Sequence, residues 1–387
     1  MFASAHGRTG LMAEIALSGL GYRYANASED TLTGLSLSIA KGEAHALLGG
    51  SGAGKTTLLN LLSGLLQPTA GDIRFAGESV ARTPAAQRGV SQVFQFPVLY
   101  EALSVLDNLG FPLRTAGVRK AQRQHRARQI AQLLDFEGNG FGDLQKQRPA
   151  ALSLYQKQLL AIGKALVRPD LKLVLLDEPL TAVAPSLKWT LRNTLRQVQR
   201  ELGVTMVYVT HDQTEALTFA DRVSVMHEGA IVQSDTPQVL YRQPQHTYVG
   251  FFIGSPGMNF VAAKVENNTL CWGDSKVPLT AAVADGPVQI GFRPEWGTVT
   301  AADSSSVAAA SGLTMLGRLQ GVRTTALSAD TRSGLMRIMT PEPVELSGRL
   351  QHEPGAQLRV AVPYALLYRQ QRYVASVGAF AQVPAQV

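Results

Sequence analysis

Residues 49–56 have the composition and spacing of a phosphate-binding loop. They read Gly-Gly-Ser-Gly-Ala-Gly-Lys-Thr and fill every fixed position of the pattern G-x-x-x-x-G-K-[ST]. Glycines let backbone N–H groups point at a phosphate, and the helix that follows such a loop adds its positive N-terminal end. Lys55 can reach the β- and γ-phosphates, and the Thr56 hydroxyl can coordinate Mg²⁺. The alternative, a glycine-rich turn that binds nothing, is disfavoured by the strand and helix patterns on either side.

Two carboxylates form the second candidate group. Asp177 and Glu178 follow residues 172–176, which are almost wholly apolar. Such a run is typical of a parallel strand that is buried on both faces and opens onto a site at its carboxyl end. We expect Asp177 to hold Mg²⁺ and Glu178 to polarise the attacking water. A structural carboxylate pair is the alternative, and the intact phosphate loop makes the catalytic interpretation the favoured one.

Two further strand ends supply weaker candidates. Gln95 ends the strand pattern of residues 91–95, where its amide oxygen could lie near Mg²⁺ or the attacking water. His211 follows the apolar run 205–209 and could steady the γ-phosphate in the transition state. Either side chain alone could be structural, so both hypotheses depend on the loop and the carboxylates.

A parallel sheet is needed to bring these side chains together, and the chain has the pattern for one. Alternating or continuous apolar runs predict strands, and a helical pattern follows the loop. The strands are expected at 15–20, 35–39, 44–48, 71–77, 91–95, 172–177, 205–209 and 223–226, and the helix at 57–66. Residues 98–158 are helical in pattern, and their basic side chains lack the interleaved aromatics of a nucleic-acid site, so a solvated helix face is favoured. These basic residues are Arg114, Arg119, Lys120, Arg123, Arg126 and Arg128.

Past Pro244 the charge thins and short alternating segments are broken by Gly, Pro, Asn and Asp. This pattern predicts a small all-β domain, with a barrel as one arrangement. The segments are 259–265, 288–292, 317–322, 335–339 and 357–362. Residues 301–311, rich in Ala, Asp and Ser, are expected to form a flexible loop, and residues 1–11 a disordered extension before a natural start at Met12.

Composition bounds the protein class. A length of 387 residues is typical of two or three domains, and 45% hydrophobic with 17% charged residues is typical of a globular protein. The net charge of +7 could favour an anionic membrane surface or a polyanion, but a solvated basic surface accounts for it equally well. The single cysteine, Cys271, excludes an intrachain disulfide and fits a reducing compartment. No apolar stretch is long enough to span a bilayer, so any membrane role must come through partners.

In this order the motifs resemble those of the nucleotide-binding subunits of ATP-binding cassette (ABC) transporters, and more closely the ATPase subunits of bacterial carbohydrate and polyol importers. The resemblance covers nearly the whole chain from Met12. It implies an α/β P-loop NTPase fold at 12–243, with a RecA-like core, an antiparallel β subdomain and a helical subdomain at about 98–158. It also implies an all-β, OB-type regulatory domain at 244–387, because residues 248–260 and 291–295 resemble segments of that domain.

The resemblance further implies ATP and Mg²⁺ as cofactors and assigns the site residues. Catalysis is assigned to Glu178, His211 and Gln95, and the metal to Thr56, Gln95 and Asp177. Nucleotide contacts are assigned to Tyr24, which would stack on adenine, and to Gly49, Gly50, Ser51, Gly52, Ala53, Gly54, Lys55, Thr56, Thr57, Ser153 and Gln156. For the neighbouring Tyr22, a role as a plain strand aromatic is favoured.

Two departures from the family pattern stand out. The signature Leu-Ser-Gly-Gly-Gln reads Leu-Ser-Leu-Tyr-Gln at 152–156, and we expect Leu154 and Tyr155 to add bulk where a partner's phosphate should sit. The segment Ser-Ala-Leu-Asp after the carboxylates reads Thr-Ala-Val-Ala at 181–184, so its acidic residue is missing. In the family each cassette lends these two elements to the ATP of the other cassette. The elements that serve its own ATP are intact here, which favours a heterodimer with an unlike cassette.

The expected partners are that second cassette, two transmembrane permease subunits that dock near residues 96–108 and, indirectly, a periplasmic solute-binding protein, with no nucleic acid. The expected location is peripheral, on the cytoplasmic face of the bacterial inner membrane. Glycerol or glycerol phosphate is one candidate solute. Two alternatives stay open: a regulatory cassette that binds ATP with little hydrolysis, and a soluble cassette ATPase outside transport.

Overall fold

The computed structural model describes residues 13–273, 275–302, 313–324, 333–340, 342–349 and 354–378. The extension predicted at residues 1–11, the start at Met12 and most of the loop predicted at 301–311 lie outside these ranges; Ala301 itself ends strand β15. The chain divides into two compact units that meet between Pro237 and Gln238. The boundary predicted from the sequence, 243/244, falls between helices α7 (Pro237–Arg242) and α8 (Thr247–Phe252).

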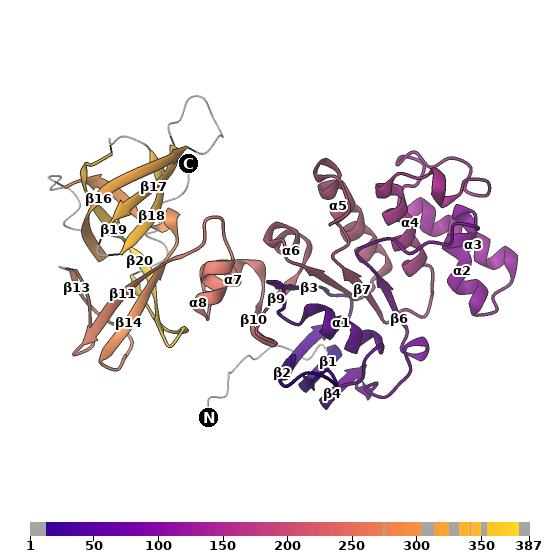
Figure 1. Cartoon of the computed structure of the whole chain (residues 1–387), viewed down its shortest axis with the longest axis horizontal. Helices are drawn as coiled ribbons and strands as arrows, with labels where there is room; N and C mark the ends of the chain where they lie inside the picture. The colour runs from indigo at the N-terminus through magenta and orange to yellow at the C-terminus, as the bar shows by residue number, and fades with distance from the viewer. Residues whose placement is uncertain are drawn as a thin grey trace. The chain divides into compact units, whose positions relative to one another are not determined.

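A six-stranded sheet forms the centre of the first unit (Figure 1). Its strands pair in parallel except for β10, which pairs antiparallel with β9 at one edge. In spatial order they are β10 (Ala230–Asp235), β9 (Arg222–His227), β3 (Ala44–Gly49), β8 (Met206–Thr210), β7 (Leu173–Asp177) and β6 (Val90–Val93). β3 and β8 are buried along their whole length, as their mostly apolar sequences predict.

A second, antiparallel sheet pairs β2 (Leu32–Ala40), β1 (Ala13–Tyr22), β4 (Ala70–Phe75) and β5 (Glu78–Ser79). Helix α1 (Lys55–Ser63) shares one apolar core with strands of both sheets. The helix predicted at 57–66 therefore begins two residues earlier and ends earlier, because Gly64 adopts a left-handed conformation that terminates it.

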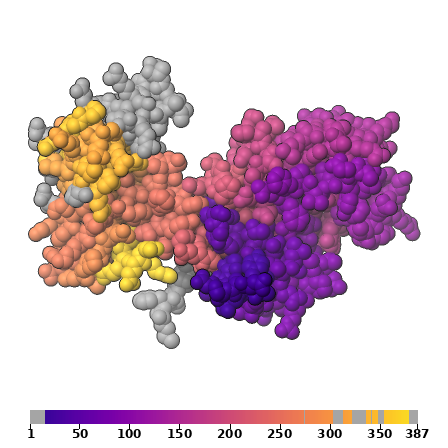
Figure 2. Space-filling model, in the orientation of Figure 1, coloured from indigo at the N-terminus to yellow at the C-terminus, as the bar shows by residue number. Residues whose placement is uncertain are grey.

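The helical segment contains α2 (Val105–Thr115), α3 (Lys120–Leu133), the short turn η2 (Pro149–Ala151) and α4 (Leu154–Leu166). Figure 1 shows α2, α3 and α4 grouped together. In Figure 2 the purple and magenta surface of this segment lies at one end of the first unit, with the indigo surface of β1 and β2 at the other. The apolar faces of α2, α3 and α4 share a core with α5 (Pro185–Leu202). Helix α6 (Gln213–Phe219) follows β8. The remaining turn is η1 (Ala85–Gln87).

The second unit is all-β apart from α7, α8 and the turn η3 (Pro294–Trp296), as the sequence predicts, within the ranges that the structure describes. One sheet orders β13 (Ser275–Pro278), β12 (Thr269–Trp272), β11 (Asn259–Glu266), β14 (Gly286–Phe292), β20 (Tyr364–Arg369) and β21 (Arg372–Gly378). The other orders β15 (Thr298–Ala301), β19 (Gln357–Val362), β16 (Leu313–Thr324), β17 (Ser333–Met339) and β18 (Pro343–Arg349). Both sheets are antiparallel and contribute to one apolar core around Trp296 and Phe292.

Candidate nucleotide-binding site

The parallel strands bring the candidate residues to one edge of the central sheet. Leu48 on β3 pairs with Thr210 on β8, and Asp177 on β7 pairs with Val209 on β8. Because these strands run in the same direction, their carboxyl ends lie at the same level. The phosphate loop, Asp177 and His211 are all at these carboxyl ends. This edge is where α/β sheets bind ligands.

Two glycines of the phosphate loop, Gly49 and Gly54, leave no room for a Cβ. A Cβ on Gly49 would lie 2.5 Å from the Met226 carbonyl oxygen, and one on Gly54 would lie 2.6 Å from Leu32 Cδ2. Gly54 also has a left-handed φ of 93° and forms the N-cap of α1 without any side-chain cap. The N–H groups of the first helical turn are therefore left for a ligand, and an anion is the ligand that they and the helix dipole favour.

Lys55 is held inside the loop. Its Nζ donates to the carbonyl oxygens of Gly49 and Gly50, both at 2.9 Å, and the residue is only 8% exposed. Burial lowers the pKa of the Lys55 ammonium, while the carboxylates of Glu178 and Asp177 oppose that shift. A desolvated ammonium forms stronger hydrogen bonds with charged phosphate oxygens than with the two neutral carbonyls that hold it here.

Glu178 and Asp177 have different surroundings although they are adjacent in the chain. Burial raises the pKa of the Asp177 carboxyl, Glu178 raises it further, and Lys55 opposes the shift. Glu178 instead accepts two side-chain hydrogen bonds, from His211 Nδ1 to Oε1 at 2.9 Å and from Thr181 Oγ1 to Oε2 at 3.1 Å. Its backbone is left-handed, with φ 46°, and this strained conformation is typical of functional positions.

His211 follows the end of β8, which buried hydrogen bonds hold in place. Its side chain is 61% exposed and faces Glu178. Beneath it, the buried Glu215 carboxylate accepts from the hydroxyls of Tyr208 and Thr210, at 2.9 and 3.0 Å. Burial, together with Glu215, raises the pKa of the Tyr208 hydroxyl well above its ordinary value. This network fixes the end of β8, and with it the place from which His211 extends.

A cavity of about 610 Å³ opens over these groups. It is lined by Thr31, Ser51, Gly52, Ala53, Gly54, Lys55, Thr56, Thr57, Glu178 and His211. Tyr24 lies beside it: the ring is 43% exposed, its hydroxyl is 3.1 Å from Thr57 Oγ1, and Tyr22 packs edge-on against it at 4.8 Å. An exposed ring next to a phosphate cradle is placed for a base to stack on.

The donor set fits Mg²⁺ bound together with a triphosphate. Within the described residues no group of three or more His, Cys, Asp and Glu gathers into a metal cage. Mg²⁺ instead favours one or two carboxylates with phosphate oxygens and waters, and Asp177 with the exposed Thr56 hydroxyl provides such a set.

The prediction of a strand that ends at Gln95 is wrong. β6 stops at Val93, which is its last residue paired with β7. Gln95 lies two residues further along the chain, half-buried in a bend.

The altered signature differs from its predicted geometry at Tyr155. Ser153 and Gln156 form a reciprocal capping box at the start of α4, and Gln156 Nε2 also donates to the carbonyls of Asn139 and Gly140. The Tyr155 ring turns into the helical subdomain, is only 9% exposed, and its hydroxyl donates to Asn139 Oδ1 at 2.9 Å. The expectation that Tyr155 adds bulk at the helix end is therefore wrong. Leu154 is 47% exposed at the start of α4, so the same expectation for Leu154 stays a prediction.

The second altered segment leaves α5 without a capping side chain. Ala184 is the N-cap residue, and Pro185 begins the helix. An aspartate, the family's residue at this position, would accept from a first-turn N–H group, which Ala184 cannot do.

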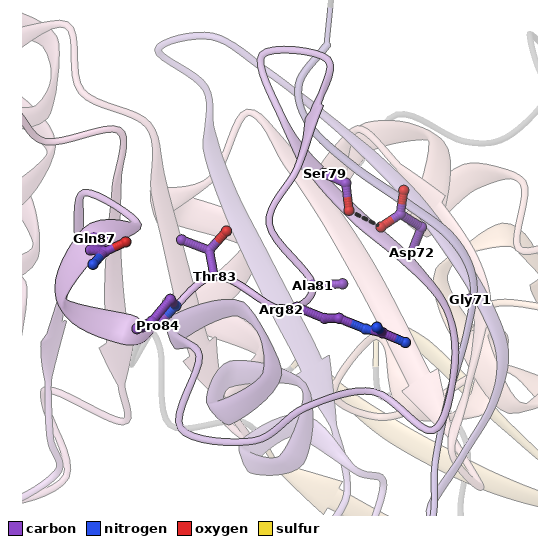
Figure 3. Close-up of a pocket in the computed structure, with 8 residues that line it drawn as sticks. All are labelled: Gly71, Asp72, Ser79, Ala81, Arg82, Thr83, Pro84 and Gln87. Atoms are coloured by element: carbon purple, nitrogen blue, oxygen red, sulfur yellow. Dashed lines mark hydrogen bonds between the residues drawn. The ribbon is translucent and has the colours of Figure 1, made fainter.

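Another cavity, of about 530 Å³, lies between the β4–β5 hairpin and η1 (Figure 3). It is lined by Gly71, Asp72, Ser79, Ala81, Arg82, Thr83, Pro84 and Gln87. Its carboxylate, Asp72, is already bonded to the Ser79 hydroxyl, the Arg74 guanidinium and the Ile73 N–H, and these bonds lower its pKa. Unlike the first cavity, this one is lined by neither a glycine-rich phosphate loop nor a lysine.

The fold and the cavity over the phosphate loop define a P-loop ATPase with an appended OB-type domain. The family described as "ABC transporter" matches residues 32–181, and the family described as "MalK OB fold domain" matches residues 254–296. The chain belongs to the ATP-binding subunits of ABC transporters. The two antiparallel sheets of the second unit are those of the OB-type domain predicted from the sequence.

Curated relatives agree with this family. The diacetylchitobiose uptake system ATP-binding protein MsiK of Streptomyces coelicolor is 39% identical over 279 residues, covering 70% of this chain and 72% of that protein. The sn-glycerol-3-phosphate import ATP-binding protein UgpC of Vibrio vulnificus is 40% identical over 274 residues, with the same shares. The trehalose import ATP-binding protein SugC of Mycobacterium tuberculosis is 40% identical over 292 residues, covering 73% and 72%.

Two solved structures share the ATPase fold. CbiO1 from Clostridium perfringens, part of the transporter complex cbiONQ, is 27% identical with a TM-score of 0.55, over 60% of this chain and 91% of that one. The cassette MJ0796, in a post-hydrolysis dimer with ADP and Pi, is 26% identical with a TM-score of 0.51, over 58% and 98%. Among the described residues, no helix combines the length and apolarity needed to cross a membrane.

Sequence reasoning missed two contributors to the site. Thr181 belongs to the segment 181–184 that departs from the family pattern, and its hydroxyl donates to Glu178 Oε2. Glu215 was not singled out, although it organises the end of β8. A threonine three residues after a glutamate in a turn is a recognisable local signal. The buried bonds of Glu215 join two elements and have no such signal.

Proposed function

We propose that this chain binds Mg²⁺·ATP in its own pocket and hydrolyses it to power a bacterial importer of a carbohydrate or polyol, beside a second cassette that is not identical to it. ATP hydrolysis follows from the family. The solute class, the metal, the residue roles and the unlike partner are the parts proposed here.

The observation that carries the proposal is a contrast between two sets of residues: those that serve this chain's own ATP and those that the family lends to a partner's ATP. In its own pocket, Lys55 lies in the loop, Glu178 is bonded to His211, and Asp177 stands beside both. The elements that the family lends to a partner's ATP are both altered: Leu154 is exposed at the start of α4, and Ala184 leaves α5 uncapped. A homodimer would combine each sound pocket with an altered signature, whereas an unlike cassette can supply a sound one.

The proposed roles follow from the geometry of the pocket. The loop and Lys55 hold the phosphates, and Tyr24 stacks on the base. Thr56, Asp177 and Gln95 would hold Mg²⁺, which when bound neutralises charge on the β- and γ-phosphates. Glu178 orients and polarises water for in-line attack, and His211 steadies both Glu178 and the γ-phosphate.

Membrane partners are supported by an exposed apolar patch. Phe94, Phe96, Val98 and Tyr100 follow β6 and are all exposed. Large apolar side chains exposed close together in one short segment are typical of a protein-contact surface. We propose that two permease subunits dock there, which would place the chain peripherally at the cytoplasmic face of the inner membrane and link it indirectly to a periplasmic solute-binding protein. Glycerol phosphate, a sugar or a related polyol is the proposed solute class, because the relatives named above import such compounds.

The test compares the purified chain alone with the chain co-expressed with its candidate partner cassette and permeases. We expect ATPase activity to be near background for the chain alone, to rise at least tenfold in the assembled complex, and to be lost with Glu178→Gln. Robust activity of the isolated chain would contradict the unlike partner. Activity unaffected by Glu178→Gln would contradict the role of Glu178.

The exposed Leu154 favours a second candidate, a regulatory cassette that binds ATP with little turnover, if this chain pairs with a second copy of itself and each Leu154 lies at the other copy's ATP. Single-turnover hydrolysis in the assembled complex separates the two. A burst of one ADP per copy of this chain supports the motor, and ATP that stays intact supports the regulatory cassette.

A further inference from the structure

Glu178 is held by more than its neighbouring histidine. Its backbone N–H donates to the Val209 carbonyl on β8 at 2.9 Å, which fixes the main chain at a left-handed φ of 46°. The side chain must then turn towards the cavity from a fixed base. Its Oε1 is bonded to His211, whose side chain is 61% exposed.

Thr181 supplies the second support, from a rigid position. Its backbone N–H donates to the Glu178 carbonyl at 3.1 Å, and its hydroxyl donates to Glu178 Oε2 at 3.1 Å. The two bonds close residues 178–181 into one turn. Leu180 and Val183 on either side are buried in the core shared with α5, so the turn cannot shift without exposing them.

We propose that Thr181 is a positioning residue for ATP hydrolysis: it holds the Glu178 carboxylate in the orientation from which that carboxylate directs the attacking water. The inference rests on the proposed role of Glu178. A hydrogen bond to an ionised carboxylate is stronger than one between neutral groups, so this contact is able to select one rotamer of Glu178. The branched Cβ of threonine restricts χ1 and keeps the hydroxyl on the carboxylate.

Other groups facing Glu178 do not replace this contact. Lys55 attracts the carboxylate and Asp177 repels it through space, but neither has a hydrogen bond to it in the structure. Without the Thr181 hydroxyl, only the exposed His211 would fix the side chain.

The experiment uses the assembled complex, with the equivalent glutamate of the partner cassette changed to glutamine so that only this chain's pocket turns over. Three variants are compared: Thr181→Val, which keeps the shape and loses the donor; Thr181→Ser, which keeps the donor; and Glu178→Gln. Single-turnover rate, the Kd for ATP and Tm are measured for each. Because Thr181 is exposed and Glu178 is only half-buried, we expect all three to fold.

We expect Thr181→Val to lower the single-turnover rate by about 10- to 100-fold, the range that one hydrogen bond to a charged group supports, with the Kd for ATP and Tm unchanged. Thr181→Ser should restore most of the rate. A Val variant with the wild-type rate, while Glu178→Gln is inactive, would overturn the positioning role and leave the proposed function standing. Val and Ser variants that both lose ATP affinity or Tm would show a merely structural role, and an active Glu178→Gln would overturn the proposed function itself.

Discussion

Leu154→Gly and Tyr155→Gly should have opposite consequences, although both restore a glycine of the family signature. Leu154 occupies the first position of α4 and is exposed, so its removal costs about 1 kcal/mol or less in unfolding free energy. Tyr155 is buried and bonded to Asn139. Its removal costs about 3–5 kcal/mol for the aromatic ring, with roughly 1 kcal/mol more for glycine in a helix. That total is a large share of the 5–15 kcal/mol that typically stabilises a domain.

The assay isolates the pocket to which this chain lends its signature. In an assembled complex that carries Glu178→Gln in this chain, the remaining ATPase activity comes from the partner's pocket. We expect Leu154→Gly in that background to raise the activity severalfold and Tyr155→Gly to leave it unchanged or lower it. Leu154→Ala is the matched control and should fall between wild type and the glycine variant. Activation by Tyr155→Gly but not by Leu154→Gly, or urea unfolding of Tyr155→Gly at the wild-type midpoint, would refute the reasoning.

Three further outcomes are expected. Ala184→Asp should cap α5 and raise the unfolding free energy by about 0.5–2 kcal/mol in urea titration, with Ala184→Ser giving a similar gain; no change in either would contradict the uncapped helix. Because burial raises the pKa of Asp177, its ionisation destabilises the nucleotide-free fold as pH rises above its ordinary pKa of 3.8. Asp177→Asn should thus have a higher unfolding free energy than wild type at pH 7, and the difference should disappear as the pH falls towards 3.8. A difference that stays constant on acidification would refute this. Tyr24→Ala should raise the Kd for ATP roughly 5- to 150-fold, as loss of about 1–3 kcal/mol of base stacking implies, while Tyr24→Phe should bind nearly as wild type; equal binding by Tyr24→Ala would rule out stacking.

The sequence predicts the phosphate-binding loop and the carboxylates well because their geometry is local. The short, mostly apolar run before Gly49 is typical of a buried strand, and a strand followed by this glycine pattern leaves little freedom for Lys55. The same holds for Asp177 and Glu178, which a buried strand delivers to the edge of the sheet. The all-β character of the second unit is likewise visible in its alternating runs.

What the sequence does not predict depends on contacts between distant segments. The direction of the Tyr155 ring is set by its burial among the helices and by Asn139, sixteen residues earlier in the chain. The end of β6 at Val93 is set by how far β7 can pair with it, so Gln95 falls beyond the strand. The contact between Thr181 and Glu178 is local, and its spacing is visible in the sequence, but the left-handed backbone at Glu178 that accompanies it is not suggested by any propensity of glutamate.

The central claim is that ATP is hydrolysed in this chain's own pocket and only slowly, or not at all, in the pocket to which it lends its signature. The most direct measurement is the ATPase rate of the assembled complex with Glu178→Gln in this chain, set against the same complex with the equivalent glutamine change in the partner cassette. Loss of most activity with the first change and retention of most with the second is the predicted result. Equal losses, or retention with Glu178→Gln alone, would contradict the account.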